Sequence, residues 1–384
     1  MYLPNYKDGS IVNLMSSILK AYGFDSKYEP LKNFDSRELA ESTNVVLMVI
    51  DGLGYEYLLE YGKDSIFNEH IKDKMTSVFP ATTATGITTF VTGVAPQQHA
   101  ITGWFMYLKE FGLVTAILPF TPRCGLSSGQ ANMDPKMIFN QRSVSEKMNA
   151  DSYYVIRADL VNSDYTRTTE GKSKGIPYTT LTEYFSKTRD VILSNNNKKY
   201  IYAYWPELDS LAHKYGIKSA RVFTHFQELN KGLISFLESI KGTNTTIIVT
   251  SDHGLIDTTN SRTIKLEEHP DFVDTLTLPL CGEPRVAYCY VRPSKVNKFE
   301  EYVRKNFKDC CKLYKAEELI RKNYFGLFEP NERLSERIGD YVLIMRENYV
   351  MKDIVQGEKV HYYTGNHGGV SEEEMFVPLI VIRR

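Results

Sequence analysis

Three short apolar runs, each followed closely by an acidic residue, constrain the fold of this chain more than any other feature. They are NVVLMVI (44–50), KYIYAYW (199–205) and TTIIVT (245–250). Apolar runs of this length are typical of strands buried on both faces of a parallel sheet. A fourth run of the same kind, FVPLIVI (376–382), lies near the end of the chain.

Helical patterns separate these runs. Apolar residues at helical spacing predict a helix over 12–22, and we expect further helices over 84–92, 207–215 and 217–240. Strands that alternate with helices predict an α/β sandwich with a mostly parallel central sheet. Ligands of such sheets bind outside the carboxyl ends of the strands.

Two stretches fit this pattern less well. Residues 105–199 contain polar, loop-like segments such as NSDYTRTTEGKSKG (162–175), and residues 261–360 mix short strands with charged helices. The elements expected in the second stretch are a strand over 285–291 and helices over 298–308 and 316–322. We interpret 261–360 as an inserted cap subdomain that folds over the site. The catalytic α/β domain would then consist of residues 1–260 and 361–384.

Composition excludes several classes of protein. The net charge of −1 and the pI of about 6.7 do not match the basic surface of a dedicated nucleic-acid binder. The five cysteines are odd in number and form no C-x-x-C, which indicates free thiols in a reducing compartment. We find no signal peptide and no apolar stretch long enough to span a membrane, so we expect a cytoplasmic protein, with export by a signal-less route as the alternative.

Two acidic segments carry a histidine at a spacing suited to metal binding. In DSLAH, Asp209 and His213 are four residues apart, so a helix would place both side chains on one face, where they could hold one metal ion. In SDHG, Asp252 and His253 follow the run 245–250, and a turn at that point would let both reach one ion. The alternatives are a solvated helix face for the first pair and a polar turn for the second.

Two further segments complete the candidate metal site. Asp51 ends the first apolar run within DGLG, and His367 lies in the glycine-rich TGNHGG (364–369) before the last run. Taken alone, Asp51 would end a strand and cap a helix, and His367 would be an ordinary loop residue. Together, three Asp and three His in four separated segments indicate two divalent metal ions, with zinc expected and manganese or iron as alternatives. Pairs of such ions, roughly 3.5–4 Å apart, serve enzymes that displace groups at phosphorus.

A threonine-rich segment, VFPATTATGITTFVTG (78–93), supplies a candidate nucleophile. A threonine at a helix N-terminus places its hydroxyl beside free N–H groups, which can also hold phosphate oxygens. A metal ion in contact with that hydroxyl would make it nucleophilic near neutral pH. The alternative is a threonine that caps the helix.

These motifs resemble the alkaline phosphatase superfamily, specifically its type I phosphodiesterase/nucleotide pyrophosphatase family. The matching stretches, in the order of the family, are VVLMVIDGLG (45–54), FPATTATGITTFVTGVAPQQHAITG (79–103), ELDSLAHKYG (207–216), TSDHG (250–254) and TGNHGG (364–369). The resemblance implies an alkaline phosphatase-like α/β/α sandwich with a smaller inserted cap. It also implies a small phosphorylated substrate, with a nucleotide as one candidate.

The resemblance assigns roles to individual residues. It implies a first metal held by Asp209, His213 and His367, and a second held by Asp51, Asp252 and His253. It places the nucleophile, which would also bind the second metal, at Thr83, with Thr82 as the competitor. The implied mechanism is hydrolysis through a phospho-threonine intermediate.

The sequence departs from the family near the nucleophile. The position of an Asn that usually binds a phosphate oxygen is occupied here by Trp104, with Gly103 beside it, and Ala-Thr-Gly (84–86) replaces the more usual Phe-Pro-Asn. Trp104 could stack on a substrate ring, although a packed aromatic is the alternative. His361 is close enough to His367 in sequence to line the site as well.

Other functions remain open on this scaffold. A phosphomonoesterase, a mutase or a phosphonate hydrolase would use the same metals and nucleophile. The mutases of the superfamily use Ser and carry a large insertion soon after it, and a sulfatase would need Cys or Ser at the nucleophile, so Thr83 argues against both. A non-catalytic protein that binds phosphorylated ligands is the third alternative.

Overall fold

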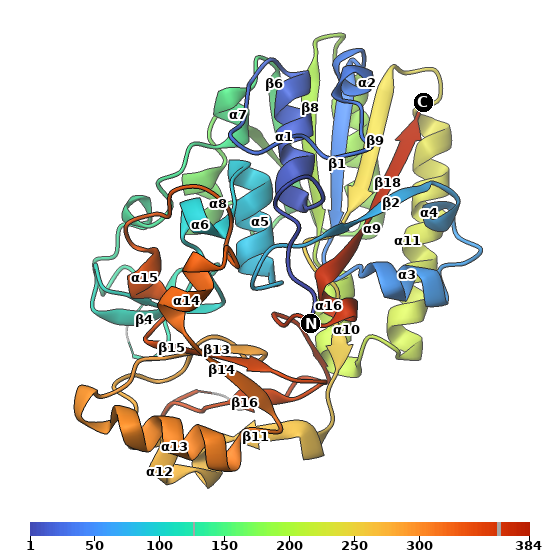
Figure 1. Cartoon of the computed structure of the whole chain (residues 1–384). Coiled ribbons are helices and arrows are strands. Elements are labelled where there is room, and N and C mark those ends of the chain that lie inside the picture. The colour runs from blue at the N-terminus through green and yellow to red at the C-terminus, as the bar shows by residue number, and fades with distance from the viewer. Residues whose placement is uncertain (126, 359–361) are drawn as a thin grey trace.

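Two sheets organise the computed structural model, which describes residues 1–125, 127–358 and 362–384. Within these ranges, a seven-stranded central sheet lies beside a second seven-stranded sheet (Figure 1). His361 lies outside the described residues. In spatial order, the central strands are β2 (Ile71–Thr76), β18 (Phe376–Arg383), β9 (Thr245–Thr250), β1 (Asn44–Ile50), β8 (Lys199–Trp205), β6 (Asp151–Arg157) and β7 (Lys174–Tyr178).

The central sheet is mostly parallel, as predicted. β1 pairs in parallel with β8 and β9, and β6 pairs in parallel with β7 and β8. The last strand differs from the prediction, because β18 is antiparallel to both β9 and β2. The start of β18 therefore lies at the same edge of the sheet as the carboxyl ends of β1, β8 and β9.

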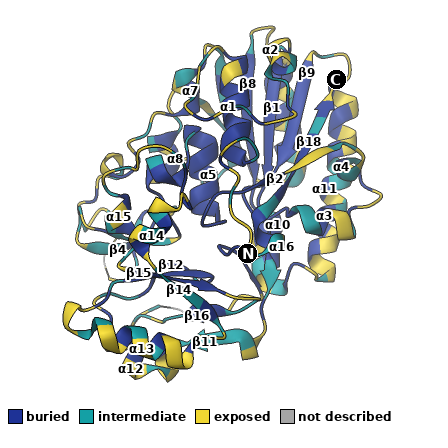
Figure 2. Ribbon diagram, in the orientation of Figure 1, coloured by how far each residue is buried: buried dark blue, intermediate teal, exposed yellow. Residues whose placement is uncertain are grey.

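Alternating side chains of the central strands pack against helices on both faces. Along β1, Val45, Leu47 and Val49 belong to one core cluster, whereas Val46, Met48 and Ile50 belong to another. This alternation follows from the two-residue period of a strand, and burial of both faces explains why the runs are apolar throughout (Figure 2). The first cluster includes α1 (Ile11–Ala21) and α5 (Thr83–Thr92), and the second includes α3 (Tyr55–Tyr61), α9 (Leu181–Leu193), α10 (Glu207–Tyr215) and α11 (Ala220–Ser239).

The second sheet is antiparallel and draws on two distant segments. Its strands, in spatial order, are β14 (Cys311–Lys315), β15 (Tyr341–Met345), β13 (Val286–Cys289), β12 (Cys281–Glu283), β3 (Phe105–Leu108), β4 (Leu113–Ala116) and β5 (Thr121–Pro122). The helices associated with it are α12 (Pro270–Val273), α13 (Val296–Asn306), α14 (Ala316–Arg321) and α15 (Leu334–Arg337). The stretch 261–360 thus shares its sheet with strands from residues 105–122, which the sequence pattern does not reveal.

Short elements connect the two sheets and the outer helices. They are α2 (Ser36–Ala40), α4 (Ile66–Glu69), α6 (Pro96–His99), α7 (Val144–Lys147), α8 (Asp164–Thr169), α16 (Glu372–Met375), β10 (Ile256–Asp257), β11 (Thr263–Lys265), β16 (Val350–Lys352) and β17 (Gly365–Asn366). Among the described helices, none combines the length and the apolar character needed to cross a bilayer.

Candidate metal centre and active site

The six predicted metal ligands lie at one edge of the central sheet. Asp51 follows β1, and Asp252 and His253 follow β9. Asp209 and His213 belong to α10, which begins just after β8, and His367 follows β17 and precedes β18. Because β18 runs antiparallel to its neighbours, the His367 segment reaches the same edge as the carboxyl ends of the parallel strands.

Two groups of buried side chains could each hold a metal ion. Asp51, Asp252 and His253 form one, and Asp209, His253 and His367 form the other; the ligand atoms within each group lie within 4.8 Å of one another. The first group matches the predicted second metal. In the other group, His253 stands where the prediction has His213.

His213 nevertheless lies beside that second group. Its Nε2 is 3.3 Å from Asp209 Oδ2 and 3.2 Å from His367 Nε2. The His253 ring stacks on the His367 ring with centroids 3.9 Å apart, so the two groups adjoin. All six predicted side chains therefore meet at one place.

Hydrogen bonds to the backbone set the orientation of two of the histidines. His213 Nδ1 lies 2.8 Å from Gly365 O, and His253 Nδ1 lies 3.0 Å from Gly254 O. A carbonyl can only accept, so each Nδ1 carries a proton, and Nε2, the nitrogen on the side of the carboxylates, is the atom that could bind a metal ion. This arrangement is typical of histidine ligands of metal ions.

Close packing holds α5, which carries both candidate nucleophiles, against the candidate metal ligands. Gly86 of α5 lies so near Asp252 that an added Cβ would be 2.7 Å from Asp252 Cβ. The hydroxyl of Tyr204, on β8, donates a hydrogen bond to Asp51 Oδ2. The close approach to Asp252 explains why position 86 of the helix is a glycine, although glycine inside a helix costs stability.

Several buried polar atoms at the centre fit a metal ion. Asp51 Oδ1, Asp209 Oδ1, Asp252 Oδ2 and His367 Nδ1 are buried and have no hydrogen-bond partner among the residues that the structure describes. Unpaired buried carboxylate oxygens are costly unless a cation compensates them. The donor set of carboxylate oxygen and imidazole nitrogen suits divalent metals such as zinc.

The electrostatics of the centre lead to the same expectation. Burial raises the pKa of the Asp51 carboxyl well above its usual value, and the neighbouring Asp252 and Asp209 raise it further. Burial lowers the pKa of His367 well below its usual value, and His253 adds to the effect. Burial opposes the ionisation of Asp209, but His213 outweighs it and holds the Asp209 pKa below its usual value. Bound cations would relieve the repulsion among these carboxylates.

The two candidate nucleophiles have different surroundings. Thr82 is the N-cap of α5 and Thr83 is its first residue. Thr83 Oγ1 lies 3.1 Å from His253 Nε2, and Thr83 lines the cavity at the site. Thr82 Oγ1 instead donates to Glu283 Oε1 at 2.7 Å, and only 1% of Thr82 is exposed, against 9% of Thr83.

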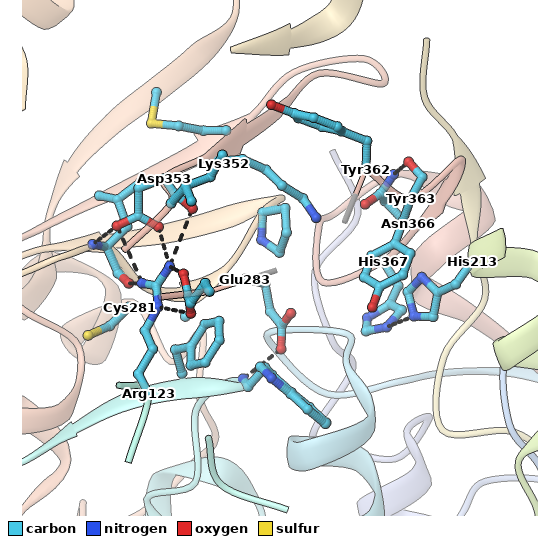
Figure 3. Close-up of a pocket in the computed structure, with 18 of the residues that line it drawn as sticks. Arg123, His213, Cys281, Glu283, Lys352, Asp353, Tyr362, Tyr363, Asn366 and His367 are labelled. Atoms are coloured by element: carbon cyan, nitrogen blue, oxygen red, sulfur yellow. Dashed lines mark hydrogen bonds and ion pairs between the residues drawn. The ribbon is translucent and has the colours of Figure 1, made fainter. Parts of the chain in front are cut away.

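A cavity of about 520 Å³ extends from the centre to the second sheet (Figure 3). Asp209, His213 and His367 line one end, and the other end includes Arg123, which is paired with Asp353 at 2.7 Å and with Glu358 at 2.8 Å. The lining between them is largely apolar and aromatic, and it consists of Trp104, Phe105, Leu280, Pro284, Met351, Ile354, Tyr362 and Tyr363. Trp104, the predicted substrate contact, lines the cavity and is 37% exposed.

Some residues of the site escape sequence reasoning. Glu283, Arg123 and Lys352 line the cavity, and Tyr204 supports Asp51, but no local motif marks any of them. Glu283 and Lys352 come from the stretch that we interpreted as a cap, and Arg123 comes from the stretch 105–199. The sequence offers one indirect signal for Glu283 and Lys352, because the stretch 261–360 lies between two segments that carry candidate metal ligands.

Similar proteins bear out the fold. Murine ectonucleotide pyrophosphatase/phosphodiesterase 5 is 18% identical, with 87% of each chain covered and a TM-score of 0.67. An inactive threonine-to-alanine form of that murine protein, in complex with AMP, is 17% identical over 87% of each chain, with a TM-score of 0.68. Phosphonoacetate hydrolase from Sinorhizobium meliloti 1021, in complex with phosphonoformate, is 17% identical over 94% of this chain and 93% of its own, with a TM-score of 0.66. Among curated proteins, none matches this chain by sequence.

Fold and family together define a metal-dependent enzyme that hydrolyses phosphate esters. The profile of the type I phosphodiesterase/nucleotide pyrophosphatase family matches residues 45–370. The chain belongs to this family, and the resemblance that its motifs indicated is confirmed.

Proposed function

We propose that this enzyme is a two-metal phosphodiesterase that acts through a phospho-threonine on Thr83. The observation that carries the proposal is the meeting of six carboxylate and imidazole side chains beside one threonine hydroxyl. Asp51, Asp252 and His253 would hold one ion. Asp209, His213 and His367 would hold the other, which we expect, like the first, to be zinc, with manganese as the alternative.

The bound ions would supply positive charge that favours an ionised Thr83 hydroxyl and offsets charge on the phosphoryl group. Thr83 Oγ1 attacks phosphorus, the new Oγ–P bond forms, and the bond from phosphorus to the leaving oxygen breaks. The Thr83 hydroxyl gives its proton to solvent water, and the leaving alkoxide takes a proton from water and departs as an alcohol. A water molecule then cleaves the phospho-threonine, which regenerates Thr83 and releases a phosphate monoester.

The position of Thr83 supports its assignment over Thr82. Thr83 lines the cavity and lies next to His253, whereas Thr82 is turned toward Glu283. The N-terminus of α5 adds free N–H groups near the same point, and these can hold phosphate oxygens. The murine neighbour was solved in an inactive form in which one threonine is replaced by alanine.

We propose that the leaving group occupies the apolar and aromatic part of the cavity. Trp104 presents an exposed ring there, and one structural neighbour was solved with AMP. A planar ring stacked on Trp104 is therefore one candidate for the group carried by the substrate. Nucleotide diesters are the corresponding substrates to assay.

The test is turnover of bis-p-nitrophenyl phosphate and of p-nitrophenyl phosphate, with and without a chelator. We expect preference for the diester, loss of activity with chelator, and recovery when zinc or manganese is added. Preference for the monoester would replace the diester proposal with a phosphomonoesterase. No turnover of either substrate in the presence of metal would indicate a protein that only binds phosphorylated ligands.

A phosphonate hydrolase is the second candidate. The phosphonoacetate hydrolase neighbour covers more of this chain than the murine phosphodiesterase does, 94% against 87%. Release of inorganic phosphate from phosphonoacetate, in the absence of diester activity, would favour this alternative.

A further inference from the structure

A buried carboxyl group lies beside the nucleophile segment without belonging to either metal-binding group. Glu283 ends β12, is only 7% exposed, and lines the same cavity as Thr83. In Figure 3 its side chain lies between the Arg123 ion pairs on one side and His213 and His367 on the other. A charge at this position lies in the same cavity as Thr83 and within hydrogen-bond distance of the adjacent Thr82.

The hydrogen bonds to Glu283 come from uncharged donors only. Its Oε1 accepts from Thr82 Oγ1 and from the backbone N–H of Trp104, both at 2.7 Å, and both donors are uncharged. The nearby Arg123 is already paired with Asp353 and Glu358. Lys352 and the site histidines attract the Glu283 carboxylate electrostatically.

The backbone around Glu283 is packed too tightly for the carboxyl group to move far. Gly368, next to His367, lies so close that an added Cβ would be 2.8 Å from Glu283 Cβ. Gly103 lies equally close to Gly282, with an added Cβ 2.8 Å from Gly282 Cα. The backbone and Cβ of Glu283 are thus held between the segment that carries His367 and the segment that carries Trp104.

Charge distinguishes the two classes of phosphate ester. A diester carries one negative charge, whereas a monoester above pH 7 carries close to two, because its second pKa is about 6. In a site with little water, a fixed carboxylate near the phosphoryl group repels the second charge strongly. Discrimination by a repulsive group is a general route to specificity.

We infer that Glu283 is a specificity-determining residue that disfavours dianionic monoesters and so directs this site toward monoanionic diesters. The inference rests on the proposed function, since it requires the phosphoryl group to be attacked by Thr83. Burial raises the pKa of the Glu283 carboxyl to about 7, although the hydrogen bonds from Thr82 and Trp104 lower it in part. The group is therefore ionised in mildly alkaline solution.

The experiment compares the metal-loaded wild-type enzyme with Glu283→Gln at pH 8.5. Glutamine keeps an oxygen that can accept from Thr82 and Trp104, and it removes only the charge. We expect the ratio of kcat/KM for bis-p-nitrophenyl phosphate to kcat/KM for p-nitrophenyl phosphate to fall about tenfold, through a gain on the monoester. Glu301→Gln is the control, because Glu301 is an exposed residue of α13 that does not line the cavity, and its ratio should stay within about twofold of wild type.

The outcomes separate this inference from the proposed function. A wild-type enzyme that prefers the diester, with an unchanged or higher ratio in Glu283→Gln, would overturn the role of Glu283 alone. A wild-type enzyme inactive on both substrates would overturn the proposed function. Should Glu283→Gln fail to fold, Glu283→Met removes the charge at similar volume, and its ratio must shift in the same direction.

Discussion

At the scale of single residues, burial and the repulsion between neighbouring carboxylates together determine the electrostatics of the site. Asp51 and Asp252 approach the same histidine nitrogen, with Asp51 Oδ1 at 3.3 Å and Asp252 Oδ2 at 3.4 Å from His253 Nε2. Without a cation, burial and the nearby carboxylates favour the protonated form of Asp51. Two bound divalent cations would therefore stabilise the ionised form of these carboxylates.

The first residue-scale prediction concerns the nucleophile. Thr83→Ala removes the attacking oxygen, so we expect kcat to fall at least about a thousandfold while bound metal stays near the wild-type level. Thr82→Ala is the matched control, since it removes a neighbouring hydroxyl that faces Glu283, and it should retain most of the activity. Stopped-flow or steady-state assays with metal analysis would check both, and the reverse pattern would move the nucleophile to Thr82.

The second residue-scale prediction concerns stability and pH in the metal-free protein. Burial raises the pKa of Glu283 in the folded protein from the ordinary value of 4.5 to about 7, so the folded state favours the protonated group. Its contribution to stability is therefore full below about pH 4.5 and is lost as pH rises through 7. Glu283→Gln should be roughly 3 kcal/mol more stable than wild type at pH 8 and nearly equal at pH 4.5, as measured by urea unfolding. A difference independent of pH would contradict this account.

At the scale of elements, one ion pair connects the second sheet to the metal-binding loops. The buried Arg285, at the start of β13, pairs with Glu374 of α16 at 2.7 Å. Glu374 also accepts from the backbone N–H of Gly369 at 2.7 Å, and its carbonyl accepts from Gly254 N at 2.9 Å. The pair thus lies within two or three residues of the segments that carry His367 and His253.

We expect Arg285→Met to destabilise the protein by about 3–5 kcal/mol, because it leaves the Glu374 carboxylate buried without its partner. The double variant Arg285→Met/Glu374→Met should recover most of that loss, since a packed apolar pair can replace a buried ion pair. Thermal or urea unfolding of both variants tests this, and a double variant no more stable than the single one would argue against it.

Helix α10 carries two of the predicted ligands one turn apart. Asp209→Asn or His213→Ala should lower bound metal from two ions toward one per chain, because we propose that these two side chains, 3.3 Å apart, bind the same ion. Inductively coupled plasma mass spectrometry would measure the number of metal ions bound per chain. His225→Ala is a suitable control, because His225 lies on α11 and accepts from Trp205 Nε1 at 3.0 Å, away from the two metal-binding groups. Two ions retained in the α10 variants would contradict the ligand assignment.

The strands that could be predicted from the sequence are those that are buried on both faces, because such strands are apolar throughout. β1, β8 and β9 have the predicted boundaries because both faces of each strand are buried. The helix expected from 217 begins at Ala220 instead, capped by Ser219. β7, with the sequence KGIPY, is an edge strand that combines Gly and Pro, so no apolar run marks it.

The candidate site was predictable to the extent that its residues lie in strand-end motifs. Asp51 and Asp252 follow buried strands, and parallel strands bring their carboxyl ends to one edge. Glu283 and Arg123 were not predictable, because they reach the cavity through pairing of β12 with β3 between segments far apart in the sequence. Such long-range pairing leaves no local trace in the sequence.

At the scale of the whole molecule, the two sheets contribute different parts of the candidate site. The central sheet positions the ligand side chains and α5, and the second sheet supplies Glu283 and much of the cavity wall. The antiparallel β18 brings the His367 segment back to the shared edge. The account therefore depends on both sheets enclosing one dinuclear centre.

Anomalous diffraction from crystals of the zinc-loaded enzyme tests this claim most directly. The account predicts two anomalous peaks roughly 3.5–4 Å apart, one among Asp51, Asp252 and His253 and the other among Asp209, His213 and His367. A single peak, or peaks that leave either ligand set empty in an active enzyme, would contradict it.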